Sequence, residues 1–317
     1  MHAGQAGASS TPVSSAHAGT SAPAAGSGGT TGSDAGASAA GAGGSTGSAG
    51  ASAAGSGSEP MSSGLPKVMT TDGDGPFDVT QNLSTGPAGQ SGLFRPSKLG
   101  ENGLKHPIFV WGCGGTATPS SYTNELKRIA SHGFVVIAEV SNIGDNGQPL
   151  LAAADWIVAE NARQGSELYG MLDTTRLALG GHSIGSVNSF LAGVDKRWTT
   201  TVHVAGGSLD DVNDPNAPTT GMGGKNLIHP TAYVCAENDV FGNDEKTQKD
   251  YDNTTVPVFF TIIAGADHVG ATMAGLPVII AWLRWQLAGE AEWRSSFLDP
   301  QGQFCTGKYM SHSKNWN

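Results

Sequence analysis

Residues 181–185, Gly-His-Ser-Ile-Gly, constrain the fold more than any other feature of this sequence. They directly follow an apolar run at residues 176–180, which predicts a strand that leads into a sharp turn. The pattern G-x-S-x-G is typical of a strand-turn-helix unit whose serine has strained backbone angles and whose flanking small residues let strand and helix approach. Ser183 would then stand at a helix start, where backbone N–H groups stabilise negative charge. Because 47 glycines also produce such spacings by chance, the surrounding sequence has to support this interpretation.

The composition divides the chain near residue 65. Before that point the sequence is almost entirely Gly, Ala, Ser and Thr, and its only acidic residues are Asp34 and Glu59. Such a segment cannot bury enough apolar surface to offset chain entropy, so we expect residues 1–65 to be a disordered tether. Residues 66–317 suit a single α/β domain with a sizeable core, which would be the catalytic domain.

Within this domain, strand patterns alternate with helix patterns. Strands are expected at residues 76–80, 92–96, 106–111, 134–140, 176–180, 199–204, 231–236 and 256–263. Helices are expected at residues 119–132, from 149 onward, after 183, at 244–251 and at 276–287. Residues 206–228 are rich in Gly, Asp, Asn and Pro and predict a long loop. The alternation predicts an α/β fold whose mostly parallel sheet is flanked by helices and carries its chemistry beyond the carboxyl ends of the strands.

Charge and hydropathy narrow the possible partners and location. The formal net charge is -10 and no run of Lys or Arg occurs, so nucleic acid and anionic membranes are not expected as partners. No apolar stretch reaches the roughly 18 residues that span a bilayer. The start of the chain shows no signal peptide. Low-complexity tethers are nevertheless commonest on exported bacterial proteins, so we expect a secreted or cell-surface monomer whose signal or lipid anchor is not present in this chain.

Cysteine and histidine spacing predicts neither a metal site nor a cofactor. Cys113, Cys235 and Cys305 have no metal-ligand spacing and form no even disulfide set. Cys113 and Cys235 fit buried hydrophobic positions, and a Cys113 nucleophile is a weaker alternative to Ser183. His203, on an expected strand, fits a core position.

Two further residues give the serine the partners that it needs. A serine hydroxyl is a poor nucleophile at neutral pH, so it requires a base and an acid that orients the base. Asp239 follows the expected strand 231–236 and His268 follows the strand 256–263, in the order Ser, Asp, His that this fold uses. His182 should point away from the site, because it directly precedes the nucleophile. The alternative acids are Glu237, Asp210 and Asp211.

A Gly-rich loop after the strand 106–111 supplies the remaining requirement. An oxyanion hole in this fold combines a backbone N–H from this loop, residues 113–116, with the N–H of Ile184. We expect Gly114, Thr116 and, from the long loop, Leu209 to contact the substrate.

Residues 75–298 resemble the α/β-hydrolases of the dienelactone-hydrolase-like and bacterial polyester hydrolase group, which includes cutinases and PET hydrolase-like proteins. Residues 130–136, Ala-Ser-His-Gly-Phe-Val-Val, look like a block typical of the polyester hydrolases, as do residues 237–239 and the later His268. The resemblance implies the α/β-hydrolase fold, the triad Ser183, Asp239 and His268, and an ester or polyester substrate without a cofactor. Counting back from residues 130–132 places Gly115 at the loop donor of the oxyanion hole.

The chain also departs from that family. Gly115 stands where the polyester hydrolases usually carry an aromatic residue, and Ile184 replaces their usual Met. Residues 206–210, Gly-Gly-Ser-Leu-Asp, lack the expected Trp, so these departures do not favour an aromatic polyester as the natural substrate. The family's C-terminal disulfide cannot form with Cys305 alone in that region.

The sequence therefore predicts a serine hydrolase that cleaves carboxylic esters through an acyl-enzyme. Two alternatives stay open. One is a lactone hydrolase or acyltransferase on the same scaffold, and the other is a non-catalytic surface binding protein with an inert hydrolase fold.

Overall fold

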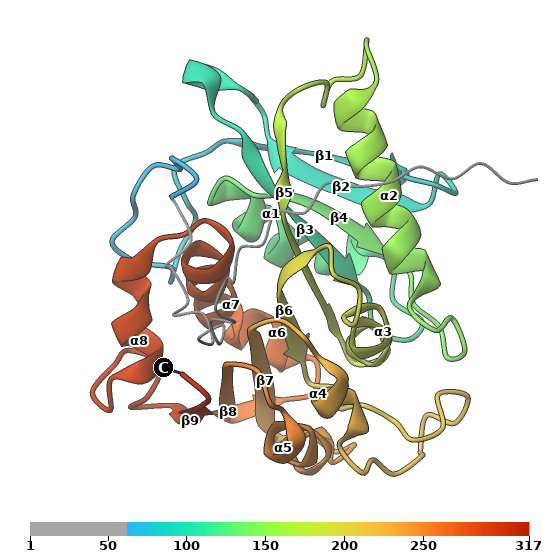
Figure 1. Cartoon of the computed structure of the whole chain (residues 1–317), viewed down its shortest axis with the longest axis vertical. Helices are drawn as coiled ribbons and strands as arrows, with labels where there is room; N and C mark the ends of the chain where they lie inside the picture. The colour runs from blue at the N-terminus through green and yellow to red at the C-terminus, as the bar shows by residue number, and fades with distance from the viewer. Residues whose placement is uncertain (1–61, 317) are drawn as a thin grey trace, which may run out of the picture. The chain divides into compact units, whose positions relative to one another are not determined.

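The computed structural model describes residues 62–316 (Figure 1). The tether expected at residues 1–65 lies almost wholly outside the described residues. Its last residue, Leu65, is buried at 5% exposure and packs into the main hydrophobic core. The packed part of the chain therefore begins slightly before the expected boundary.

The described residues form one sheet in the order β1-β2-β4-β3-β5-β6-β7-β8-β9. The pairs from β4 through β3, β5, β6 and β7 to β8 are parallel, whereas β1, β2 and β9 pair antiparallel at the two edges. The strands are β1 Val79–Thr85, β2 Ser91–Pro96, β3 His106–Gly112, β4 Val135–Glu139, β5 Leu172–His182, β6 Trp198–Val204, β7 Thr231–Asn238, β8 Val258–Asp267 and β9 Tyr309–Lys314. The expected α/β-hydrolase fold with a mostly parallel sheet is confirmed.

Helices cover both faces of the sheet because successive strand residues point to opposite faces. On β3, Ile108 and Val110 pack with α2, while Phe109 and Trp111 pack into the core that contains α1 and α7. Figure 1 shows α2 and α3 on one side of the sheet and α1 and α7 on the other. The helices are α1 Thr123–Ser131, α2 Gln148–Ala162, α3 Ile184–Ala192, α4 Met222–Asn226, α5 Asn243–Asn253, α6 Gly270–Ala274, α7 Leu276–Trp282 and α8 Arg294–Leu298.

Several elements differ from the sequence-based expectation. The first strand begins at Val79 and not at residue 76, and the long loop contains the short helix α4. The last apolar helix ends at Trp282 and continues as a π-helical turn over Leu283–Leu287. Strand β9 was not expected from the sequence, because its polar residues lie at an exposed edge. No helix among the described residues has the length and apolar character needed to cross a membrane.

Candidate active site

The turn that carries Ser183 joins β5 to α3. Ser183 has φ 55° and ψ −120°, a strained conformation for a residue with a side chain. A Cβ atom at Gly185 would lie 2.1 Å from the carbonyl oxygen of Gly112, and one at Gly181 would lie 2.4 Å from the backbone of Gly185. Both flanking residues therefore have to be glycine, which is the close approach that the G-x-S-x-G spacing predicts.

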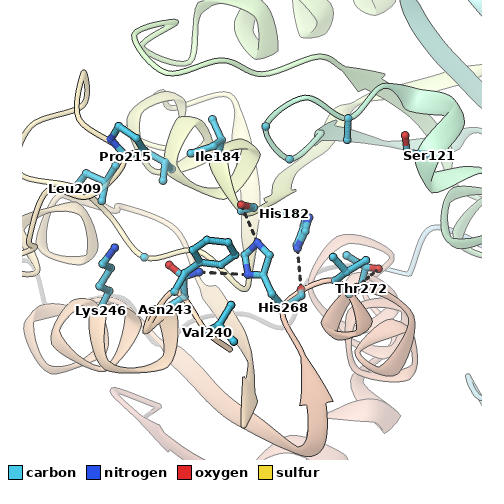
Figure 2. A pocket seen from close by; sticks show the side chains of 18 of the residues that line it. Ser121, His182, Ile184, Leu209, Pro215, Val240, Asn243, Lys246, His268 and Thr272 are labelled. Carbon is cyan, nitrogen blue, oxygen red and sulfur yellow. Dashed lines mark hydrogen bonds between the residues drawn. The ribbon is translucent and has the colours of Figure 1, made fainter. Parts of the chain in front are cut away.

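The structure brings Ser183, His268 and Asp239 together from the ends of three strands. Nε2 of His268 lies 3.0 Å from Oγ of Ser183, and Nδ1 of His268 lies 2.9 Å from Oδ2 of Asp239. In Figure 2 the imidazole of His268 lies close to Asn243, which lines the same cavity. Because the carboxylate can only accept, Nδ1 carries the proton and Nε2 is free to accept the serine proton. The geometry is that of a nucleophile, a base and an orienting acid.

Asp239 is held as a buried anion. Its side chain is 0% exposed. Burial by itself raises the pKa of this carboxyl, but hydrogen bonds from His268, the N–H of Phe241 and the amide of Asn243 hold the pKa below its usual value. The alternative acids bond elsewhere: Glu237 accepts from the N–H of Gly265, Asp210 from Thr220, and Asp211 from Asn213.

The Gly-rich loop lies directly beside the serine. A Cβ atom at Gly114 would lie 3.4 Å from Cβ of Ser183, and one at Gly115 would lie 3.2 Å from Cγ1 of Ile184. The N–H of Gly114 already donates to the hydroxyl of Tyr122 at 2.8 Å. Ile184 is the first residue of α3, so its N–H has no carbonyl in a preceding helical turn to bond. The Gly-rich loop and the start of α3 therefore place Gly115 and Ile184 beside Ser183.

A cavity of about 890 Å³ opens in front of Ser183 and His268. Gly114 and Leu209 line it, as expected from the sequence. Thr116 does not line it, which corrects the expectation: its φ of 63° turns the exposed residue out of the cavity, and Ala117 lines the wall instead.

Apolar side chains surround the mouth of this cavity. Val240, Phe241 and Val269 are 84%, 61% and 70% exposed. The Phe241 ring centroid lies 4.6 Å from that of His268, with the rings close to perpendicular. These residues were not predicted from the sequence, although an apolar pair directly after Asp239 in a turn indicates exposed hydrophobic surface.

His182 is nearer the chemistry than expected. It lines the cavity, and its ring centroid lies 4.8 Å from that of His268, so the expectation that it points away is wrong. Nε2 of His182 donates to the carbonyl oxygen of His268 at 2.9 Å, and Nδ1 accepts from the hydroxyl of Tyr122 at 2.8 Å. Burial lowers the pKa of His182 to about 4, consistent with a neutral ring. The turn at Ser183 places the side chain of His182 beside the loop after β8 that carries His268.

The remaining candidate residues lie in the core. Cys113 and Cys235 are buried, and burial raises the pKa of both thiols, so neither forms a thiolate nucleophile readily. His203 is buried and stacks on Phe190. Cys113, Cys235 and Cys305 are all free cysteines. Residues 62–316 contain no group of three His, Cys, Asp or Glu side chains that could hold a metal ion.

Comparison with known proteins agrees with the fold. No curated protein matches the chain. A family model described as PET hydrolase-like matches residues 48–312, which is most of the chain. The chain therefore belongs to the PET hydrolase-like family of α/β-hydrolases and is a hydrolase that acts on esters.

Proposed function

We propose that this protein hydrolyses carboxylic esters through an acyl-enzyme formed on Ser183. The observation that carries the proposal is the position of His268, whose two ring nitrogens lie 3.0 Å from Oγ of Ser183 and 2.9 Å from Oδ2 of Asp239. A serine held in this way loses its proton to the imidazole as it attacks, and the buried carboxylate stabilises the imidazolium.

In the first half of the reaction, Oγ of Ser183 bonds to the ester carbonyl carbon and its proton passes to Nε2 of His268. The carbonyl electron pair moves onto oxygen, and the N–H groups of Gly115 and Ile184 stabilise this oxyanion. Collapse of the intermediate breaks the bond to the alcohol oxygen, which takes the proton from His268. The products of this half are a free alcohol and an ester of Ser183.

In the second half, a water molecule replaces the alcohol. His268 takes a proton from the water as its oxygen attacks the acyl carbon, and returns the proton to Oγ of Ser183 when the acyl bond breaks. The carboxylic acid leaves, and the free enzyme is restored. Every proton and every bond is accounted for by these residues, the ester and water.

The cavity favours substrates with apolar groups. Gly115 adds no side chain over the serine, whereas Phe241 and Leu209 supply apolar surface at the cavity wall. An open cavity of about 890 Å³ accommodates a flexible ester or an accessible segment of a polyester.

Two measurements test this proposal. Ser183→Ala should lower the rate of p-nitrophenyl butyrate cleavage by ~10⁶-fold, to the detection limit, because all covalent chemistry starts at Oγ. Ser295→Ala, an exposed serine on α8, is the matched control and should keep full activity. Undiminished activity in a folded Ser183→Ala protein would overturn the proposal.

A fluorophosphonate probe separates the alternatives without a substrate. It should label the wild-type protein at Ser183, and folded protein that stays unlabelled would instead be an inert binding protein. Adding an alcohol acceptor and identifying the products by mass spectrometry distinguishes hydrolysis from acyl transfer. The free acid should predominate, whereas a predominant new ester would identify a transferase.

A further inference from the structure

We propose that Lys246 binds a carboxylate on the substrate, so that the enzyme favours acid-ended esters over neutral ones. This inference deepens the proposed ester hydrolysis at Ser183 and rests on it. Among the described residues that line the cavity, Lys246 is the one Lys or Arg side chain.

The fold directs Lys246 into the cavity. Lys246 is the fourth residue of α5, and this helix packs so closely on the loop after β6 that a Cβ atom at Gly207 would lie 2.6 Å from Cβ of Lys246. Glycine at position 207 therefore permits the approach. Figure 2 shows the Lys246 side chain rising from α5 toward Leu209 and Pro215, which line the same part of the cavity.

The ammonium group of Lys246 has no anionic partner in the part of the chain that the structure describes. The loop that carries Leu209 contains three carboxylates, but each accepts hydrogen bonds from backbone N–H groups of that same loop. They are Asp210, Asp211 and Asp214. An unpaired ammonium group at a cavity wall is a binding site for a carboxylate oxygen, because a hydrogen bond between two ions is stronger than one between neutral groups.

The other side of the cavity carries the opposite charge. Oε1 of Glu125 accepts a hydrogen bond from the Thr272 hydroxyl at 3.1 Å, and both residues line the cavity. In Figure 2, Thr272 and Lys246 lie on opposite sides of His268. An anionic substrate end is therefore repelled from the Glu125 side and attracted to the Lys246 side, which fixes the direction in which the ester lies across Ser183.

The chemistry of ester cleavage produces this kind of substrate. Each hydrolysis of a polyester leaves a carboxylate on the new acyl end. An acidic protein with a net charge of -10 repels such anions in general, so a local cation in the cavity is needed to bind them. The substrate class that fits is a half-ester of a dicarboxylic acid or a short oligoester with a terminal carboxylate.

The experiment compares matched acid and amide substrates at constant ionic strength. Monomethyl adipate carries its carboxylate on the acyl half of the ester, and methyl adipamate is its neutral amide counterpart. 4-Acetoxybenzoate carries its carboxylate on the alcohol half, and 4-acetoxybenzamide is its neutral counterpart. In Lys246→Ala, the acid-to-amide ratio of kcat/KM should fall about tenfold for one of the two pairs. The pair that responds identifies the half that carries the carboxylate.

Two variants complete the test. Lys246→Arg should keep most of the wild-type acid-to-amide ratio of kcat/KM, because the side chain is still a cation. Lys249→Ala, an exposed lysine on the same helix outside the cavity, should leave the ratio unchanged. Unchanged ratios for both pairs in Lys246→Ala would overturn the inference while leaving ester hydrolysis intact. If the wild-type protein cleaved none of the four esters, the proposed function itself would be overturned.

Discussion

The hydroxyl of Tyr122 lies 2.8 Å from Nδ1 of His182 and links the Gly-rich loop, through His182, to His268, the proposed base. It accepts the N–H of Gly114 on one side and donates to His182 on the other, while His182 in turn donates to the backbone oxygen of His268. Each donor and acceptor in this chain has one consistent role when His182 is neutral. Tyr122 therefore holds the loop and the base in a fixed mutual position.

Tyr122→Phe should lower kcat about tenfold and leave KM nearly unchanged, because it removes the hydroxyl that positions the reacting groups and keeps the ring that lines the cavity. It should also lower the free energy of unfolding by about 1–3 kcal/mol, since the buried Gly114 N–H loses its acceptor. Steady-state kinetics and urea unfolding measure both effects. Tyr169→Phe, at an exposed tyrosine, is the control. Wild-type kcat in Tyr122→Phe would show that the chain of hydrogen bonds has no positioning role.

Asp239→Asn should reduce kcat by about 10⁴-fold, because an amide can no longer hold His268 with its proton on Nδ1. Fluorophosphonate labelling of Ser183 should slow in parallel. Glu237→Gln, which changes a carboxylate two residues away that bonds to Gly265, should stay within about twofold of the wild type. If the two variants lost activity equally, Asp239 would not be the orienting acid.

Phe241→Ala should weaken the cleavage of longer acyl esters more than that of acetates. The ring is 61% exposed beside His268, so removing it takes apolar contact from the substrate and little from the protein core. We expect KM for p-nitrophenyl hexanoate to rise roughly fivefold with almost no change in melting temperature. Val194→Ala, at another exposed apolar residue outside the cavity, should change neither value. A uniform loss over all chain lengths would contradict a role in acyl binding.

The free energy of unfolding should fall as the pH drops from about 6.5 toward 4. Burial lowers the pKa values of His132 and His182 to about 4 and that of His203 to about 3, from 6.5 in the unfolded chain. Over this range the unfolded chain binds protons that the folded chain does not, so stability is complete above pH 6.5 and declines below it. Urea unfolding at several pH values measures the slope.

The variant His203→Gln tests how much one of these histidines contributes to the pH dependence of stability. It should be less stable than the wild type at pH 8, because it loses the stacking of His203 on Phe190. Its stability should nevertheless depend less steeply on pH below 6.5, by about one proton. Equal slopes in the two proteins would mean that His203 does not contribute to acid destabilisation.

The sequence was sufficient to predict the residues that depend on chain order. Ser183, Asp239 and His268 each follow a strand of the parallel sheet, and such strand ends meet at one edge, so their proximity followed from the strand pattern. Gly114, in the loop after the strand 106–111, and Leu209, in the long loop, were also expected at the site, and both line the cavity.

The sequence did not predict features that depend on side-chain direction or distant packing. Thr116 has a positive φ angle and lies outside the cavity, whereas the next residue, Ala117, lines it. Lys246 enters the cavity because α5 packs against Gly207, a contact between segments about 40 residues apart. The edge strand Tyr309–Lys314 has no alternating apolar pattern, because little of it is buried.

At Ser183, the backbone angles that position the proposed nucleophile also lower the stability of the protein. At φ 55° and ψ −120° a side chain is disfavoured, and a glycine there would relieve part of a strain that amounts to about 1–3 kcal/mol. Random mutagenesis that selects only for thermal resistance should therefore tend to erase the nucleophile. Any programme that stabilises this protein has to select for turnover and for heat resistance at the same time.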